Sequence, residues 1–276
     1  MKISKLFITG FTVVLLLVGC NKKENQFSVS GTISHAEGET LYFEKLLVSS
    51  SERLDSAKLD ESGAFQFRGE TKIPAYYLLK FSENKFITLL IDSAEQVNVE
   101  ADYANFERNY LVECSLGSIQ VKELSDHFYK TQQKLDSLQS LHNLYKGNPD
   151  YPALRKEWIA EGQKIRDNQT EFSTQFVMNN PFSMASVLAL YQKFDNEGNY
   201  VVNDLQTMRV AASALNSIYP ESAHVKALYQ NTLQLLKEEQ NAQVQKIIQE
   251  HGQNSPEIVL PNPEGEEIAL SHYVEM

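Results

Sequence analysis

The sequence predicts an α+β protein, in which an N-terminal antiparallel β-sandwich is followed by an all-helical domain. Between residues 27 and 116 apolar and polar residues alternate, which is the period of a half-buried strand. Between residues 117 and 252 apolar residues recur at steps of three and four, which is the period of an amphipathic helix. The period changes at Gly117-Ser118, so the boundary between the two domains is expected there.

Short alternating runs separated by turn residues divide the first domain into strands. Asp60-Glu61-Ser62-Gly63 is expected to close a hairpin, with glycine at the position that needs a positive φ. Residues 86–91 are apolar on both faces, which predicts a central strand. The alternating apolar positions include Phe27, Val29, Ile33, Leu41, Phe43, Phe65, Phe67, Tyr77, Leu79, Val97 and Val99.

Five helices are predicted in the second domain from stop and capping signals. The first ends at residues 147–149 (Gly-Asn-Pro), and the second opens near Asp150 with proline in its first turn. Ser183 and Ser222 are expected to cap the third and fifth helices, and Gly252 is expected to end the fifth. The apolar stripes are expected to pack into a common core. They include His142, Trp158, Val225, Leu228, Leu235 and Ile247-Ile248.

The N-terminus has the three parts of a bacterial lipoprotein signal. Lys2 and Lys5 are positively charged, residues 6–18 are almost wholly apolar, and Gly19 precedes Cys20. We expect residues 1–19 to be cleaved, the thiol of Cys20 to carry the lipid, and residues 20–26 to form a polar tether. The apolar segment is shorter than the roughly 20 residues that cross a bilayer. Asn21, rather than aspartate, follows the cysteine, so an outer-membrane anchor facing the periplasm is expected.

Composition limits the remaining function classes. The 276 residues have a formal net charge of −11, which argues against nucleic acid as a partner. Of the two cysteines, Cys114 is left alone if Cys20 is acylated. Alternation with Tyr110 and Val112 predicts that Cys114 is a small buried residue on one face of a strand.

No catalytic, cofactor-binding or metal-ligating residues are predicted. None of the six histidines forms an i,i+4 pair, and neither cysteine belongs to a Cys-x-x-Cys. No nucleophile elbow, phosphate loop or dinucleotide fingerprint is present.

Residues 255–271 contain two short apolar runs around a Pro-Glu-Gly turn, which predicts a hairpin. This stretch resembles the opening of the thioredoxin-like domain in thiol–disulfide interchange and peroxiredoxin-class proteins (redoxins). The upstream order, carried by residues 60–67, 117–118 and 180–183, is similar to envelope lipoproteins in which a β-rich domain of unknown function precedes such a domain. The matching residues of the final stretch are Pro256, Ile258, Leu260, Gly265, Leu270 and Ser271.

The resemblance implies a redox domain of which residues 253–276 are the truncated start. The chain ends at Met276, before the family's Cys-x-x-Cys. We therefore expect a lipid-anchored envelope protein that is the non-catalytic N-terminal part of a thiol–disulfide oxidoreductase. The alternative is an envelope lipoprotein that binds a ligand or partner and has no redox role. The expected partners are the membrane, through the lipid, and an envelope protein or peptide.

Overall fold

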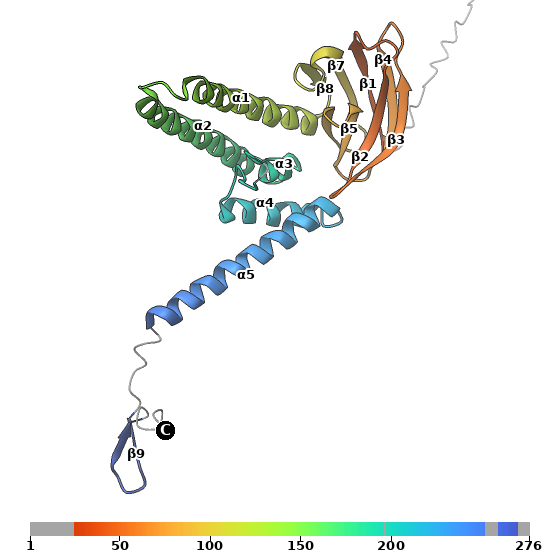
Figure 1. Cartoon of the computed structure of the whole chain (residues 1–276). Helices are drawn as coiled ribbons and strands as arrows, with labels where there is room; N and C mark the ends of the chain where they lie inside the picture. Colours follow the sequence, from red (N-terminus) through yellow and green to blue (C-terminus); the bar gives the residue numbers. More distant parts are fainter. Residues whose placement is uncertain (1–24, 196, 252–258, 270–276) are drawn as a thin grey trace, which may run out of the picture.

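The computed structural model describes residues 25–195, 197–251 and 259–269, and it has the α+β class predicted from the sequence (Figure 1). The lipid-signal residues, Cys20 among them, lie outside the described residues, as do Gly252, Pro256, Ile258, Leu270 and Ser271. No helix in the described ranges is long and apolar enough to cross a membrane.

Two four-stranded sheets form the sandwich. The first has the order β4-β1-β7-β8, and the second has the order β3-β2-β5-β6. Phenylalanine, tyrosine and aliphatic side chains from both inner faces fill the core between them. The strands are β1 (Gln26–Ser34), β2 (Thr40–Leu46), β3 (Ser51–Lys58), β4 (Ala64–Glu70), β5 (Ala75–Ser82), β6 (Lys85–Ile91), β7 (Gln96–Asp102) and β8 (Tyr110–Glu113).

Three details of the sandwich differ from the sequence prediction. β1 and β7 pair in parallel, although the remaining pairs in the two large sheets are antiparallel. The turn at residues 60–63 does not close a hairpin, because β3 pairs with β2 while β4 crosses to β1 in the other sheet. Gly63 does adopt a positive φ of 63°. The strand β3 escaped prediction because nearly all of its residues are exposed.

The predicted central strand at residues 86–91 is instead the edge strand β6. It is apolar on both faces because Ile87, Leu89 and Ile91 enter the sandwich core, while Leu90 packs against the helices. The neighbouring strand β5 is buried in the same way, with Tyr77 facing the sandwich core.

The helical region follows directly from β8. Ser115, which was not among the predicted caps, caps α1 by accepting a hydrogen bond from the Ser118 amide. Ser222 accepts one from the Val225 amide at the start of α5, as expected from the sequence. Beyond Thr232, α5 leaves the core, so Leu235 and Ile248 are exposed rather than packed as predicted. The helices are α1 (Leu116–Tyr145), α2 (Tyr151–Asn179), α3 (Ala185–Tyr191), α4 (Leu205–Ile218) and α5 (Ala223–His251), with a short 3₁₀ turn, η1 (Tyr103–Asn105), before β8.

The start of α1 is joined to the edge of β6. The backbone amide of Leu90 donates to Ser118 Oγ (3.1 Å), and Ser115 Oγ donates to the Leu90 carbonyl (3.0 Å). A Cβ on Gly117 would lie 2.7 Å from Leu90 Cγ and 2.8 Å from its carbonyl oxygen, so only glycine permits this approach. The serines thereby cover part of a sheet edge that would otherwise be open to pairing.

A second joint connects β5 to α3. Tyr76 is fully buried, and its hydroxyl donates to the Met184 carbonyl. Burial raises the pKa of Tyr76, so the hydroxyl stays protonated and able to donate. Its ring also meets the ring of His224, at the start of α5, edge to face with centroids 5.0 Å apart.

The joint predicts the effect of Tyr76→Phe. The Met184 carbonyl keeps a hydrogen bond from the Val187 amide, so we expect a loss of about 1 kcal/mol in the free energy of unfolding. Urea denaturation followed by circular dichroism measures this change. The control is Tyr42→Phe, a half-buried tyrosine on β2. Equal stability of the two variants would contradict the assigned role of the Tyr76 hydroxyl.

Candidate functional site

A cleft of about 900 Å³ lies between the α1/α2 hairpin and the segment that connects α3 to α4. In Figure 1 the hairpin extends away from the sandwich, and α3 and α4 lie beside its base. The volume falls in the range typical of ligand pockets. The principal lining residues are Leu135, Leu138 and His142 from α1, Arg155, Trp158, Gly162 and Arg166 from α2, and Phe194, Tyr200 and Asn203 from the connecting segment.

Helix α2 provides one wall through residues on a single face. Gly162 and Arg166 lie seven and eleven residues after Arg155. Both separations are close to whole turns of an α-helix, so the three residues share one face. Gly162 is buried, and a Cβ there would lie 3.6 Å from Leu138 Cδ1, an ordinary van der Waals distance. The same Cβ would lie 3.7 Å from Arg166 Nη2, so the guanidinium of Arg166 extends back along α2 beside Gly162.

The opposite wall is held in place by hydrogen bonds within the connecting segment. The carboxylate of Asp195 accepts from the Glu197 amide (3.0 Å) and from Asn199 Nδ2 (2.6 Å). These bonds, led by the one from Asn199, hold the pKa of Asp195 below its usual range. Thr170 Oγ1 on α2 donates to the carbonyl of the buried Val201 (2.9 Å), which fastens the wall to the hairpin.

Aromatic contacts fix the far end of the hairpin. The Tyr151 hydroxyl lies 3.0 Å from a His142 ring nitrogen, and the Tyr145 and Trp158 rings meet edge to face at 5.6 Å. His142 and Trp158 are half-buried and line the cleft. The prediction of Trp158 as a core residue is therefore wrong, because the hairpin extends past the elements that would cover it.

Two arginines, Arg155 and Arg166, line the cleft. In the part of the chain that the structure describes, neither Arg155 nor Arg166 forms an ion pair. Arg155 is exposed and Arg166 is half-buried. In a chain with a formal net charge of −11, two such arginines in one cleft favour an anionic ligand.

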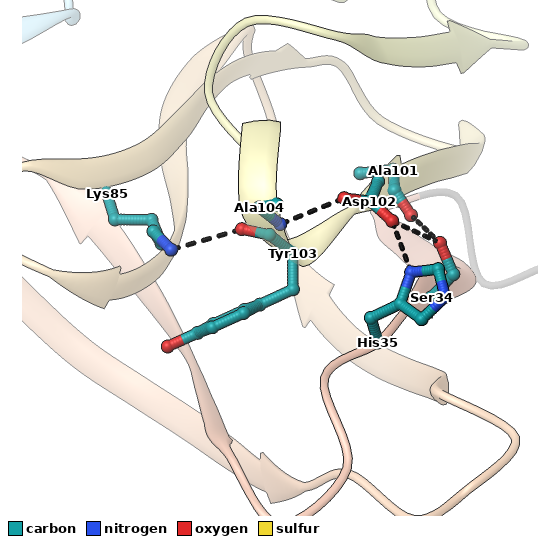
Figure 2. Close-up of polar contacts among 7 residues, drawn as sticks. All are labelled: Ser34, His35, Lys85, Ala101, Asp102, Tyr103 and Ala104. Carbon is teal, nitrogen blue, oxygen red and sulfur yellow. Dashed lines mark hydrogen bonds and ion pairs between the residues drawn. The ribbon is translucent and has the colours of Figure 1, made fainter.

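A separate polar cluster joins the ends of β1 and β7 (Figure 2). Asp102 Oδ2 lies 3.1 Å from Ser34 Oγ and 2.5 Å from His35 Nδ1, and its Oδ1 accepts from the Ala104 amide. Ser34 donates to the carboxylate rather than to the imidazole, so this is not the order of a serine nucleophile and its base.

The charge of Asp102 is stabilised by these neighbours. The hydrogen bond from His35, followed by those from the Ala104 amide and Ser34, holds the pKa of Asp102 below its usual range. The imidazole of His35 is itself 82% exposed. The cluster therefore closes the end of the sheet and caps η1.

The exposure of Cys114 differs from the sequence prediction. Cys114 is exposed, with a φ of 62°, whereas Tyr110 and Val112 are buried as expected. The strand β8 ends at Glu113, and the left-handed residue turns the chain into α1, which breaks the alternation. Ser115 is the N-cap of α1, and a serine directly before an apolar helical stripe is the sequence feature that indicates a helix start after Cys114.

Metal chemistry finds no support in the described ranges. Within residues 25–195, 197–251 and 259–269, no group of three histidine, cysteine or acidic side chains is arranged to hold a metal ion.

Comparison with known proteins matches the N-terminal part of the chain to a family model. Residues 27–139 match the family model described as a domain of unknown function (DUF4369). The match includes all eight strands of the sandwich and most of α1, whereas α2 and the connecting segment lie outside it. No curated protein and no solved structure matches the chain.

The exposure of Cys114 predicts rapid reaction with a thiol reagent. In native protein carrying Cys20→Ser, one thiol per chain should react with Ellman's reagent at a rate close to that of a free peptide thiol. The additional replacement Cys114→Ser should abolish the signal. Reaction only after denaturation would restore the buried assignment.

Proposed function

We propose that this chain is a lipid-anchored protein of the cell envelope, held at the outer membrane and facing the periplasm. The support is the arrangement of basic residues, apolar stretch and Gly19-Cys20 at the N-terminus. One or two acyl chains hold a protein at a bilayer without a spanning helix. The net charge of −11 opposes direct adhesion to anionic lipid, so the lipid would supply the attachment.

We further propose that the sandwich and helices are the non-catalytic, partner-binding part of a thiol–disulfide oxidoreductase. The observation that carries this proposal is the hairpin of β9 (Val259–Pro261) and β10 (Glu267–Ala269), in which Leu260 pairs with Ile268 and Gly265 has a φ of 86°. Such a hairpin, with Leu260 and Gly265 in these positions, resembles the first element of a thioredoxin-like domain.

A division of roles follows from this arrangement. Helix α5, 29 residues long, would separate the redox domain from the sandwich by roughly 44 Å. The cleft would bind the partner, and the downstream domain would exchange disulfides with it. Cys114 is exposed but is the only cysteine in the described ranges, so it has no resolving thiol there.

The second candidate function is partner binding without redox chemistry. The cleft supports partner binding directly. Its volume, its aromatic residues and its two arginines without ion pairs are all features of the described residues. The two functions use the same cleft and differ only in whether a dithiol follows.

The anchor predicts covalent lipid attachment. Cells expressing the full chain and fed labelled palmitate should yield a labelled protein in the membrane fraction, and Cys20→Ala should remove both label and membrane association. The matched control is Cys114→Ala, which should leave both unchanged. An unlabelled wild-type protein would exclude the proposed anchor.

The redox proposal predicts that the reading frame continues past Met276 into a Cys-x-x-Cys. The extended protein should reduce insulin in the presence of dithiothreitol, whereas residues 20–276 alone should act at background rate. A stop codon directly after residue 276 would leave partner binding without redox chemistry. Turnover by residues 20–276 that is lost in Cys114→Ser would refute the non-catalytic assignment.

A further inference from the structure

The spacing of the two cleft arginines defines the length of a ligand. Arg155 and Arg166 lie on one face of α2, eleven residues apart, which corresponds to about 16 Å along the helix axis. An extended peptide advances about 3.3 Å per residue. Successive side chains of an extended peptide point to opposite faces, so two carboxylates that face α2 together must be an even number of residues apart. A separation of four residues, about 13 Å, places both on one face within reach of the two long arginine side chains.

The other charged groups of the cleft leave the arginines available. Asp195 is occupied by Asn199 and by backbone amides on the opposite wall. Asp136 and His142 lie on α1, and His142 is in contact with the Tyr151 hydroxyl. None of these groups forms an ion pair with either arginine in the described part of the chain.

The middle of the cleft suits a short apolar stretch. The apolar and aromatic side chains of Leu138, Trp158 and Tyr200 line it. Aromatic residues and arginine are the residue types that most often provide the binding energy of protein interfaces. A guanidinium can hold a carboxylate through two parallel hydrogen bonds, which favours acidic side chains at the two ends.

We propose that the cleft binds an extended acidic peptide segment of a partner protein, with carboxylates four residues apart and apolar residues between them. Arg155 and Arg166 each bind one carboxylate, and the side chain midway between the carboxylates packs against Trp158 and Leu138. The inference rests on the partner-binding role proposed above and specifies what that partner presents.

The only tryptophan of the chain reports binding directly, since Trp158 lies in the cleft. The probe is acetyl-Asp-Ala-Leu-Ala-Asp-amide, titrated into the full chain while Trp158 emission is recorded. Replacing both aspartates by asparagine, or placing them next to each other, should weaken binding roughly tenfold or more. Raising the salt concentration should weaken binding of the acidic peptide in particular.

Variants of the cleft separate the two arginines. Arg155→Gln and Arg166→Gln should each weaken binding of the probe roughly tenfold. In each variant, replacing the aspartate that binds the missing arginine by asparagine should cause little further loss of affinity. Arg166→Lys keeps the charge and should recover only part of the affinity. The matched control is Arg68→Gln on the exposed face of β4, which should bind like the wild type. Circular dichroism confirms that each variant is folded.

Three outcomes would overturn the inference. Equal affinity for the acidic and asparagine peptides would refute the acidic preference while leaving partner binding intact. Saturable binding of a polyuronate with no binding of the peptides would assign the cleft to an acidic glycan instead. No change in Trp158 emission and no heat of binding with either class, in a folded protein, would refute the cleft as a binding site altogether.

Discussion

The structure depends on the burial of β5 and β6 from both sides. The inner face of this pair completes the sandwich core, while Tyr76 and Leu90 on the outer face anchor the helices. Full burial of a large side chain contributes about 1.5–3 kcal/mol. The hydrogen bonds from Tyr76 to Met184 and between Leu90 and the α1 serines then set the position of the helices. Sandwich and helices therefore share one sheet rather than meeting through a linker.

This attachment holds the helical hairpin at its base and leaves its far half outside the core. Near the base, Val121 and Leu124 of α1 are fully buried. Farther along, Leu138 is only half-buried and faces the cleft. The change arises because α3, α4 and the start of α5 cover only the part of the hairpin next to the sheet. The cleft is thus a consequence of the length of α1 and α2.

Much of the fold could be predicted from the sequence because its signals are local. The alternation of Phe65 and Phe67 and the capping by Ser222 each depend on neighbouring residues. The errors concern partners distant in the chain. Residues 86–91 read as a central strand because periodicity reports that both faces are buried, without distinguishing a second sheet neighbour from a covering helix. The exposed Cys114 was missed because alternation was extended one residue past the end of β8.

The cleft could not be predicted from the sequence, for a related reason. Arg155 and Arg166 are recognisable as residues on one face of a helix, yet a solvated face has the same spacing. Only the opposite wall converts that face into a site. The wall is positioned by the buried Val201, bound through its carbonyl to Thr170, and by the turn around Asp195. The wall is therefore held by contacts that involve neither arginine, and among the described residues neither Arg155 nor Arg166 forms an ion pair.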